Sequence, residues 1–240
     1  MLKSKNSIIP DKNIAISIPY DSGQLPYSKC TYATPFYNQL NTYLSAINNL
    51  NFLGTFEGRN LSEINKQFKD LASYYHDKFI ITFGGDLSIL PVILKSYLDL
   101  HQSLYLISLG HPPNNLISIY TISGSLDLST PSFSIKQIES FRKSSTDIHI
   151  FLSKNKYQKI FFAIDVSILP QNIFHFSGHR MKQQIQIHQM EIILGDILLK
   201  HQHIGACITG ISIPAQLPHD APEPETSLLT FKNILNLLIG

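Results

Sequence analysis

Three apolar stretches of the chain each end in a residue whose side chain can do chemistry. The stretches Phe79–Phe83, Ser103–Leu109 and Ile160–Ile164 are followed by Asp86, His111 and Asp165. Continuous apolar runs of this length are typical of central strands in a parallel sheet that is covered on both faces. The carboxyl ends of such strands meet at one edge of the sheet, where ligands and chemistry sit. Carboxylate and imidazole groups gathered there would be suited to metal binding or proton transfer.

Length and composition favour one globular domain. The chain has 240 residues, of which 43% are hydrophobic and 15% charged, so a single α/β domain over residues 1–240 is the simplest organisation. A net charge of +2 and scattered lysines argue against a nucleic-acid partner. Cys30 and Cys207 are the only cysteines, which predicts a reduced, cytoplasmic protein. Because no apolar run has the length of a signal peptide or a membrane span, no membrane association is expected.

Strand-like and helix-like segments alternate along the chain. Strands are expected over 13–19, 79–83, 103–109, 157–164 and 204–213, and more weakly over 52–56 and 147–152. The last of these is alternatively part of a connection from a helix to the next strand. Helices are expected over 62–75, 87–98, 134–141, 181–200 and 226–238, and loops over 20–35, 114–130, 170–180 and 214–225. This alternation predicts a three-layer α/β/α fold with a mostly parallel central sheet.

The polar ends of the three strands resemble the sequence boxes of one family. Gly84-Gly85-Asp86-Leu87-Ser88 resembles the Gly-Gly-Asp-His-Ser box of the ureohydrolases, the family of arginase, agmatinase and formimidoylglutamase. The segment 109–113 stands where that family carries Asp-Ala-His-x-Asp. The segment 163–165, with Leu169-Pro170 behind it, resembles Asp-x-Asp…Asp-Pro. The order and spacing of the three boxes match, and the similarity covers most of the chain from Ile14 to the end, so the resemblance implies an arginase-like fold.

The resemblance also implies where a binuclear manganese centre would sit. In the family this centre hydrolyses a guanidino or formimino carbon, and its six ligand positions fall on Leu87, Leu109, His111, Pro113, Ala163 and Asp165. Only His111 and Asp165 carry side chains that can bind a metal. A catalytic metal site usually keeps about three protein ligands, and two divalent cations need several carboxylates between them. We therefore expect no manganese centre and no other cofactor, and His111 and Asp165 to be vestigial metal positions.

Other functional positions implied by the resemblance are also altered. The family's proton-shuttling histidine would fall near Leu126 or Asp127, and its substrate-binding glutamate near Ile211. The substrate loop after the Asp-Pro box is shortened to 171–180. Losses in the metal, base and substrate elements together predict that the family's reaction is absent.

Each candidate residue also has a purely structural interpretation. Asp86 follows the glycine pair, where it would cap the next helix, and His111 before two prolines would be a turn residue. Asp165 would be a buried carboxylate held by hydrogen bonds. His175 and His179 are four residues apart, which suggests a zinc pair, but no predicted helix aligns them, whereas His201 and His203 lie near a helix end, where cations suit the helix dipole. Cys207 would be a small core residue, whereas Cys30 beside Lys29 could be reactive.

Three hypotheses follow. The first is a degenerate, catalytically inactive ureohydrolase-fold protein retained for binding, regulation or assembly, as a homo-oligomer or together with an intact relative. The second is an active hydrolase of C–N bonds in linear amidines, with an altered manganese site built from His111, Asp165 and residues such as Asp127 or His175. The third is a small-ligand binding protein that uses an apolar cleft lined by Leu87, Leu109 and Ala163.

Overall fold

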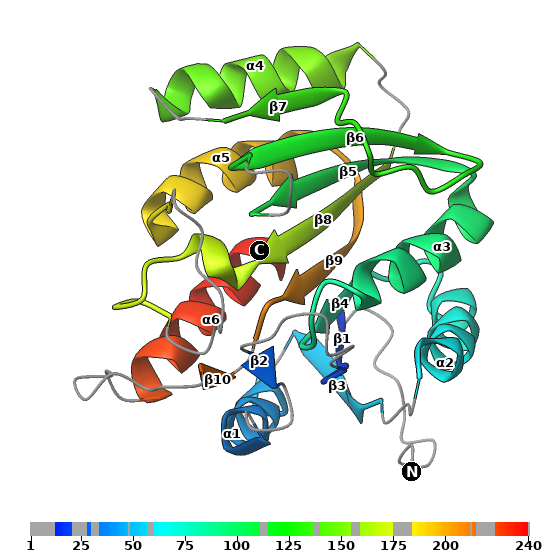
Figure 1. Cartoon of the computed structure of the whole chain (residues 1–240), viewed down its shortest axis with the longest axis vertical. Coiled ribbons are helices and arrows are strands. Elements are labelled where there is room, and N and C mark those ends of the chain that lie inside the picture. Colours follow the sequence, from blue (N-terminus) through cyan, green and yellow to red (C-terminus); the bar gives the residue numbers. More distant parts are fainter. Residues whose placement is uncertain are drawn as a thin grey trace.

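An eight-stranded sheet forms the centre of the computed structural model (Figure 1). The structure describes residues 13–20, 28–29, 34–47, 49–56, 60–110, 115–136, 140–154, 159–174, 184–211, 213–214 and 224–239. The strands, in their order across the sheet, are β3 (Leu50–Thr55), β1 (Asn13–Ser17), β4 (Ile80–Phe83), β9 (His203–Thr209), β8 (Lys159–Asp165), β5 (Ser103–Leu109), β6 (Ile117–Ser123) and β7 (Phe133–Ile135). All pairs from β3 to β5 are parallel, and β6 and β7 add antiparallel strands at one edge. The predicted mostly parallel sheet is confirmed.

Helices cover both faces of this sheet. They are α1 (Thr34–Leu44), α2 (Leu61–Tyr74), α3 (Ile89–His101), α4 (Phe141–Ser153), α5 (Ile187–Lys200) and α6 (Pro224–Ile239). One apolar cluster joins the sheet to α2 and α3, and a second joins its other face to α1, α4, α5 and α6. The fold is therefore the predicted three-layer α/β/α arrangement. A further small sheet pairs β2 (Ser28–Lys29) with β10 (Ile213–Pro214). Within the described ranges, no helix is long and apolar enough to cross a membrane.

The central strands match their predicted positions because their sequences are apolar on both faces. All four residues of β4 are buried, as are six of the seven in each of β5, β8 and β9. Side chains alternate between the two faces of a strand, so each of these strands contributes to both clusters. The weak prediction at 52–56 is confirmed by β3, at the sheet edge, and Cys207 is a fully buried core residue, as expected.

The predicted loop 114–130 is wrong, because it contains strand β6. Its sequence, Ile-Ser-Ile-Tyr-Thr-Ile-Ser, mixes apolar and polar residues without regular alternation, and it pairs antiparallel with β5 over its whole length. The irregular pattern, with polar and glycine residues on both sides, hides this strand in the sequence. The predicted loop 20–35 also contains β2 and the start of α1.

The prediction for residues 134–152 is also wrong. Ser134 lies in β7 rather than capping a helix, and the helix α4 begins after Ser140, whose hydroxyl accepts a hydrogen bond of 3.5 Å from the Lys143 N–H. The weakly predicted strand 147–152 is the end of that helix. Its apolar residues fit both periods, and the helix buries Ile148 and Leu152 while leaving Ile150 53% exposed.

The remaining boundaries shift by a few residues. Asn60, rather than Ser62, caps α2 by accepting a hydrogen bond of 3.0 Å from the Glu63 N–H. The helix α5 begins at Ile187 behind a capping box of Gln186 and Gln189, later than its predicted start at 181. Strand β9 ends at Thr209, earlier than predicted, before a glycine with positive φ. The predicted terminal helix is confirmed by α6.

The turn after β4 joins three strand ends through its backbone. The Gly84 N–H donates to the Ile208 carbonyl (2.9 Å), and the Gly210 N–H donates to the Gly85 carbonyl (3.0 Å). On the other side, the Asp86 N–H donates to the Tyr20 carbonyl (3.0 Å). Gly85 has a φ of +68°, and a Cβ there would lie 2.6 Å from the Tyr20 carbonyl oxygen. Only glycine fits this close approach without a shift of the backbone.

We predict that Gly85→Ala destabilises the protein more than Gly124→Ala. Both glycines have similar left-handed conformations, with φ of +68° and +72°, but a Cβ at Gly124 would meet nothing within 4 Å. Both variants lose about 1–2 kcal/mol of unfolding free energy from the left-handed conformation. Gly85→Ala loses a further amount of about 1–3 kcal/mol from overlap with the neighbouring backbone. Urea unfolding measures both values, and equal losses would contradict the close packing of this turn.

A polar cluster connects α4 to α5. The His149 Nδ1 lies 3.2 Å from the His201 Nε2, and the Ser145 hydroxyl donates to the Asp196 carboxylate (2.9 Å). The Asp196 carboxylate also lies 3.8 Å from the His149 Nε2 and 3.6 Å from the Lys200 Nζ. Burial, followed by the charge of Lys200, lowers the pKa of His149, against the opposing effect of Asp196. Burial, followed by His149 and Lys200, lowers the pKa of His201.

We predict that the protein loses stability between about pH 7 and pH 5, in part through these two histidines. The ordinary pKa of histidine is about 6.5, so the unfolded chain takes up protons at a higher pH than the folded chain, and protonation favours unfolding. His149→Gln should reduce this loss, and His188→Gln, at an exposed position of α5, serves as the control variant. Thermal unfolding midpoints at both pH values provide the measurement. An unchanged pH dependence in His149→Gln would show that the cluster does not contribute.

Candidate functional site

The carboxyl ends of the central strands meet at one edge of the sheet, as predicted. Asp165 at the end of β8 is in register with Thr209 at the end of β9, and Leu109 at the end of β5 is in register with Ile164. Phe83 at the end of β4 is in register with Ile208 on the other side of β9. This carboxyl edge is the candidate site, because the fold brings the predicted residues of three separate segments to it.

Asp165 is built into the backbone of the edge. Its side chain is buried, and one carboxylate oxygen, Oδ1, accepts a hydrogen bond of 2.8 Å from the Ser167 N–H. This bond caps the short 3-10 helix Val166–Ile168. A Cβ on Gly210, whose φ is +80°, would overlap the same carboxylate, so the glycine of the neighbouring segment leaves room for it. These contacts match the structural interpretation of Asp165 as a buried carboxylate held by a hydrogen bond.

Asp86 has a similar local role. Its carboxylate accepts hydrogen bonds from the Ser88 N–H (2.8 Å) and from the Ser88 hydroxyl. Its backbone carbonyl accepts a weaker bond from the Ile89 N–H (3.4 Å), at the first residue of α3. Asp86 therefore holds the turn that leads into α3, close to the predicted capping role, although the helix begins at Ile89 rather than at Leu87.

The three described ligand positions without a donor do not form one cleft. Leu109 and Ala163 are fully buried, and they belong to the apolar clusters on opposite faces of the sheet. Leu87 is half-buried and lines a separate small pocket on the α3 side. The third hypothesis, which placed all three in one apolar cleft, is therefore wrong in its lining residues. The register of β5 with β8 explains this, because Leu109 pairs with Ile164 and not with Ala163.

Several candidates lie outside the described residues, namely Cys30, His111, Pro113, His175 and His179. The other histidine pair does not come together as a site. The His201 ring stacks on His149, whereas the His203 ring packs edge-on against Phe79. Across the part of the chain that the structure describes, no three His, Cys, Asp or Glu side chains are grouped closely enough to hold a metal ion.

The positions implied for proton transfer and substrate binding also carry local roles. Asp127 is exposed, and its carboxylate accepts a hydrogen bond of 2.9 Å from the Ser129 N–H, so its pKa is lowered by Ser129. Leu126 is half-buried and lines a surface groove, and Ile211 is fully buried in the apolar core. Cys207 is enclosed in β9, where burial raises the pKa of its thiol to about 12 and so keeps it un-ionised.

Buried hydroxyl groups at the strand ends were missed by the sequence analysis. Among the described residues, four buried hydroxyl oxygens at or near the ends of β1, β5, β8 and β9 have no hydrogen-bond partner, on Ser17, Ser108, Ser167 and Thr209. A serine or threonine inside an apolar run attracts little attention in a sequence. An unpaired buried hydroxyl costs free energy, so each marks a place where a polar partner would be stabilising.

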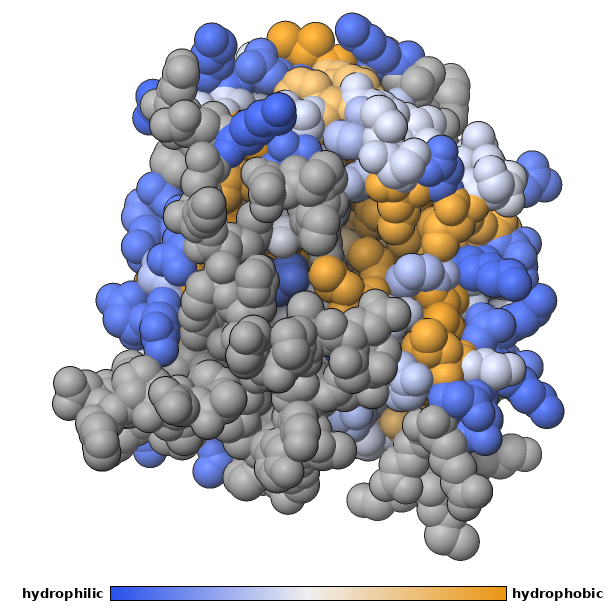
Figure 2. Space-filling model, viewed as in Figure 1, coloured by the Kyte–Doolittle hydropathy of each residue, from blue (hydrophilic) through white to orange (hydrophobic). Residues whose placement is uncertain are grey.

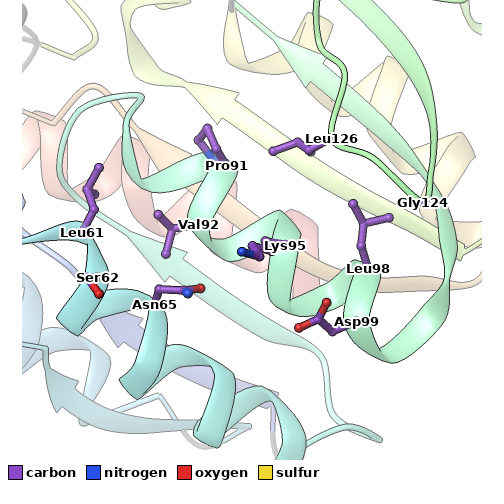
Figure 3. A pocket seen from close by; sticks show the side chains of 10 residues that line it. All are labelled: Leu61, Ser62, Asn65, Pro91, Val92, Lys95, Leu98, Asp99, Gly124 and Leu126. Carbon is purple, nitrogen blue, oxygen red and sulfur yellow. The ribbon is translucent and has the colours of Figure 1, made fainter.

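Two hollows open on the α2–α3 side. The larger, of about 590 Å³, lies between α2, α3 and the segment after β6, and Figure 3 shows the side chains that line it, with Asn65 and Lys95 between the helices. The smaller, of about 210 Å³, lies between the start of α3 and strands β5 and β6. The smaller pocket is lined by Leu87, which is itself one of the implied ligand positions.

The fold matches those of known enzymes, although no family model and no curated protein matches the sequence. Arginase from Bacillus subtilis superposes with a TM-score of 0.70 at 14% identity, over 95% of this chain and 98% of that chain. Formimidoylglutamase from Bacillus subtilis gives a TM-score of 0.69 at 13% identity, over 95% and 86% of the two chains. An agmatine ureohydrolase of Thermoplasma volcanium gives 0.64 at 14% identity, over 96% and 89%.

These similarities cover nearly the whole chain and agree with the strand order and the layers described above. The protein therefore has the arginase-like fold of the ureohydrolases, as its sequence boxes implied. At identities this low, the similarity establishes the fold alone. Any inference about activity must come from the residues of the carboxyl edge.

We predict that two of the implied ligand positions, Leu109 and Leu87, differ sharply in how well they tolerate a side chain that can bind a metal. Leu109→Asp places a carboxylate in a fully buried apolar cluster and should lower the unfolding free energy by about 3–5 kcal/mol at pH 7. Leu87→His, at a half-buried position, should lower it by about 1 kcal/mol. Chemical unfolding measures both.

The charge is tested separately with Leu109→Asn. Burial raises the pKa of a carboxyl group, so Leu109→Asp should be less destabilised at low pH, where the group is neutral, and its loss should grow as the pH rises. The neutral Leu109→Asn should show no such added pH dependence. If Leu109→Asp is as stable as Leu87→His at pH 7, then position 109 is open to solvent or to a metal after all.

Proposed function

We propose that this protein is a degenerate ureohydrolase-fold protein that has lost the binuclear manganese site and works by binding or assembly in the cytoplasm. The observation that carries the proposal is the state of the implied ligand positions. Leu87, Leu109 and Ala163 offer no donor atom, and Leu109 and Ala163 are packed into the apolar core. A divalent ion beside such side chains would lose its hydration without gaining ligands.

The remaining carboxylate does not offset this loss. The Oδ1 of Asp165 accepts a hydrogen bond from the Ser167 N–H, and among the described residues no three His, Cys, Asp or Glu side chains are grouped closely enough to hold a metal ion. Two adjacent divalent cations repel each other, and the residues present do not supply the several carboxylates that a binuclear centre needs. The donor set therefore does not fit the metal centre implied by the fold.

The proposal includes a role in assembly with other chains. Such a chain would act as a homo-oligomer, or as a regulatory subunit beside a catalytically intact relative. The exposed apolar side chains of α4 and α5, with Ile150 53% and Leu199 86% exposed, are consistent with contacts to another chain.

The second candidate function is an active hydrolase of C–N bonds in linear amidines with an altered manganese site. The observation that favours it is the set of buried hydroxyls at the carboxyl edge, because Ser167 and Thr209 lie beside Asp165 and have no partner among the described residues. A polar ligand at this edge would satisfy them. In this alternative, His111 and Asp165 would hold the metal.

The two candidates are separated by metal content and activity. The protein is purified with manganese present, its metal is measured by mass spectrometry, and hydrolysis of arginine, agmatine and formimidoylglutamate is assayed. We expect far less than one manganese ion per chain and no hydrolysis above background. Asp165→Asn is the matched variant, because an asparagine oxygen can still accept the Ser167 hydrogen bond while the negative charge is removed.

The outcome of Asp165→Asn identifies the source of any metal. Under the degenerate-site proposal, this variant keeps the same trace manganese content as the natural chain. A stoichiometric metal in the natural chain that is lost in Asp165→Asn, together with hydrolysis of any of the three substrates, would establish the second candidate instead.

A further inference from the structure

The smaller pocket on the α3 side has an uncharged and mostly aliphatic lining. It is bounded by the start of α3, by the adjacent strands β5 and β6, and by the segment that follows β6, with the lining residues Leu87, Leu90, Pro91, Leu106, Ser108, Tyr120 and Leu128. Leu106 and Tyr120 are directly opposite each other in the β5–β6 pair, so their side chains point to the same face. None of these side chains is charged, and most of the lining is aliphatic.

The lining of the pocket includes one buried polar atom that has no partner among the described residues. Ser108 is 2% exposed, and its hydroxyl makes no hydrogen bond with any described residue. The other polar side chain in the lining, Tyr120, is 3% exposed, and burial raises the pKa of its hydroxyl despite an opposing hydrogen bond with Ser118. A buried hydroxyl left unpaired beside a cavity is costly, and a ligand atom that paired with it would recover that cost.

The pocket has the size and the opening that a small molecule requires. An engineered apolar cavity of about 150 Å³ in another protein binds benzene, so about 210 Å³ accommodates a ring with a small substituent. Leu90 and Leu106 are buried, whereas Leu87 and Leu128 are half-buried and Pro91 is exposed, so the last three line the opening. Figure 2 shows a hollowed apolar area on the right of the molecule, at the level of α3 and β6 in Figure 1.

We propose that this pocket is a binding site for an uncharged, ring-sized apolar molecule with one hydrogen-bonding group. The ring packs against Leu87, Leu106 and Leu128, and its polar group bonds to the Ser108 hydroxyl. A charged ligand is disfavoured because no lining side chain is charged to pair with it. The inference goes beyond the proposed function, since this site needs neither the metal nor a partner chain, and it stands whichever of the two candidate functions is correct.

The larger hollow is a different kind of surface. It meets the smaller pocket only at Pro91, and its lining includes the charged side chains of Lys95 and Asp99 (Figure 3). Asp99 is already paired with Lys69 of α2 at 2.8 Å. Leu126 lines the larger hollow and Leu128 the smaller, so these two half-buried leucines from one segment distinguish the sites.

The test is a titration of the full chain, with leucine methyl groups labelled, followed by nuclear magnetic resonance. The probes are phenol, benzene and benzoate. We expect phenol to shift the methyl signals of Leu87, Leu90, Leu106 and Leu128 in a saturable manner. Benzene should bind at the same methyls more weakly, and benzoate should bind at least tenfold more weakly than phenol.

Two pairs of measurements locate the ligand. Ser108→Ala should weaken phenol binding by about threefold to tenfold, the worth of one hydrogen bond, and leave benzene binding within about twofold. Leu128→Phe fills the pocket and should reduce the binding of both neutral probes, whereas the matched Leu126→Phe should leave both unchanged. The thermal unfolding midpoint of each variant shows that the chain is folded during the titration.

The proposal is overturned by any of three results. These are the absence of saturable phenol shifts at the four methyls, equal binding of phenol to the natural chain and to Ser108→Ala, or loss of binding in Leu126→Phe but not in Leu128→Phe. None of these readouts depends on manganese or hydrolysis, so failure here is distinguishable from failure of the proposed function.

Discussion

The close backbone packing at the Gly84-Gly85-Asp86 turn is the constraint on which the carboxyl edge depends. The carbonyl of Gly85 accepts a hydrogen bond from the Gly210 N–H, and the Asp86 N–H donates to the Tyr20 carbonyl. These bonds join the segments that follow β1, β4 and β9. These contacts involve backbone atoms and need no metal ion. The edge can therefore keep its geometry while the side chains around it change, which is consistent with an arginase-like fold at 14% identity.

How much of the fold the sequence predicts depends on whether an element has a continuous apolar run. Strands β4, β5, β8 and β9 are buried on both faces, and their continuous apolar runs were placed correctly. Helix α4 leaves one side exposed, and strand β6 carries polar residues among its apolar ones although most of it is buried. Their apolar residues fit more than one period, and only the pairing of β6 with β5 and the packing of α4 on α5 select the observed structures.

The same distinction applies to the candidate site. That Leu87, Leu109 and Ala163 lack donor atoms is a property of the residue types, so the sequence predicts it directly. Where these side chains lie depends on strand register. The pairing of Leu109 with Ile164 puts Leu109 and Ala163 in different apolar clusters, which no local pattern indicates. The unpaired hydroxyl of Ser108 is equally invisible in the sequence, because it results from what β6 and α3 place around it.

Replacing charged ligands by apolar residues changes what an edge of this kind can bind. A cation is stabilised by several carboxylates and imidazoles. A half-buried leucine such as Leu87 instead favours contact with an apolar ligand, because that contact removes apolar surface from water. The buried hydroxyl of Ser108, which has no partner among the described residues, then provides the hydrogen-bonding group that orients a ligand in such a pocket. An uncharged ligand with one hydrogen-bonding group satisfies both conditions. Under the proposed function, the absence of metal donors and the presence of this pocket have a common physical basis, namely apolar side chains beside β5 at the carboxyl edge.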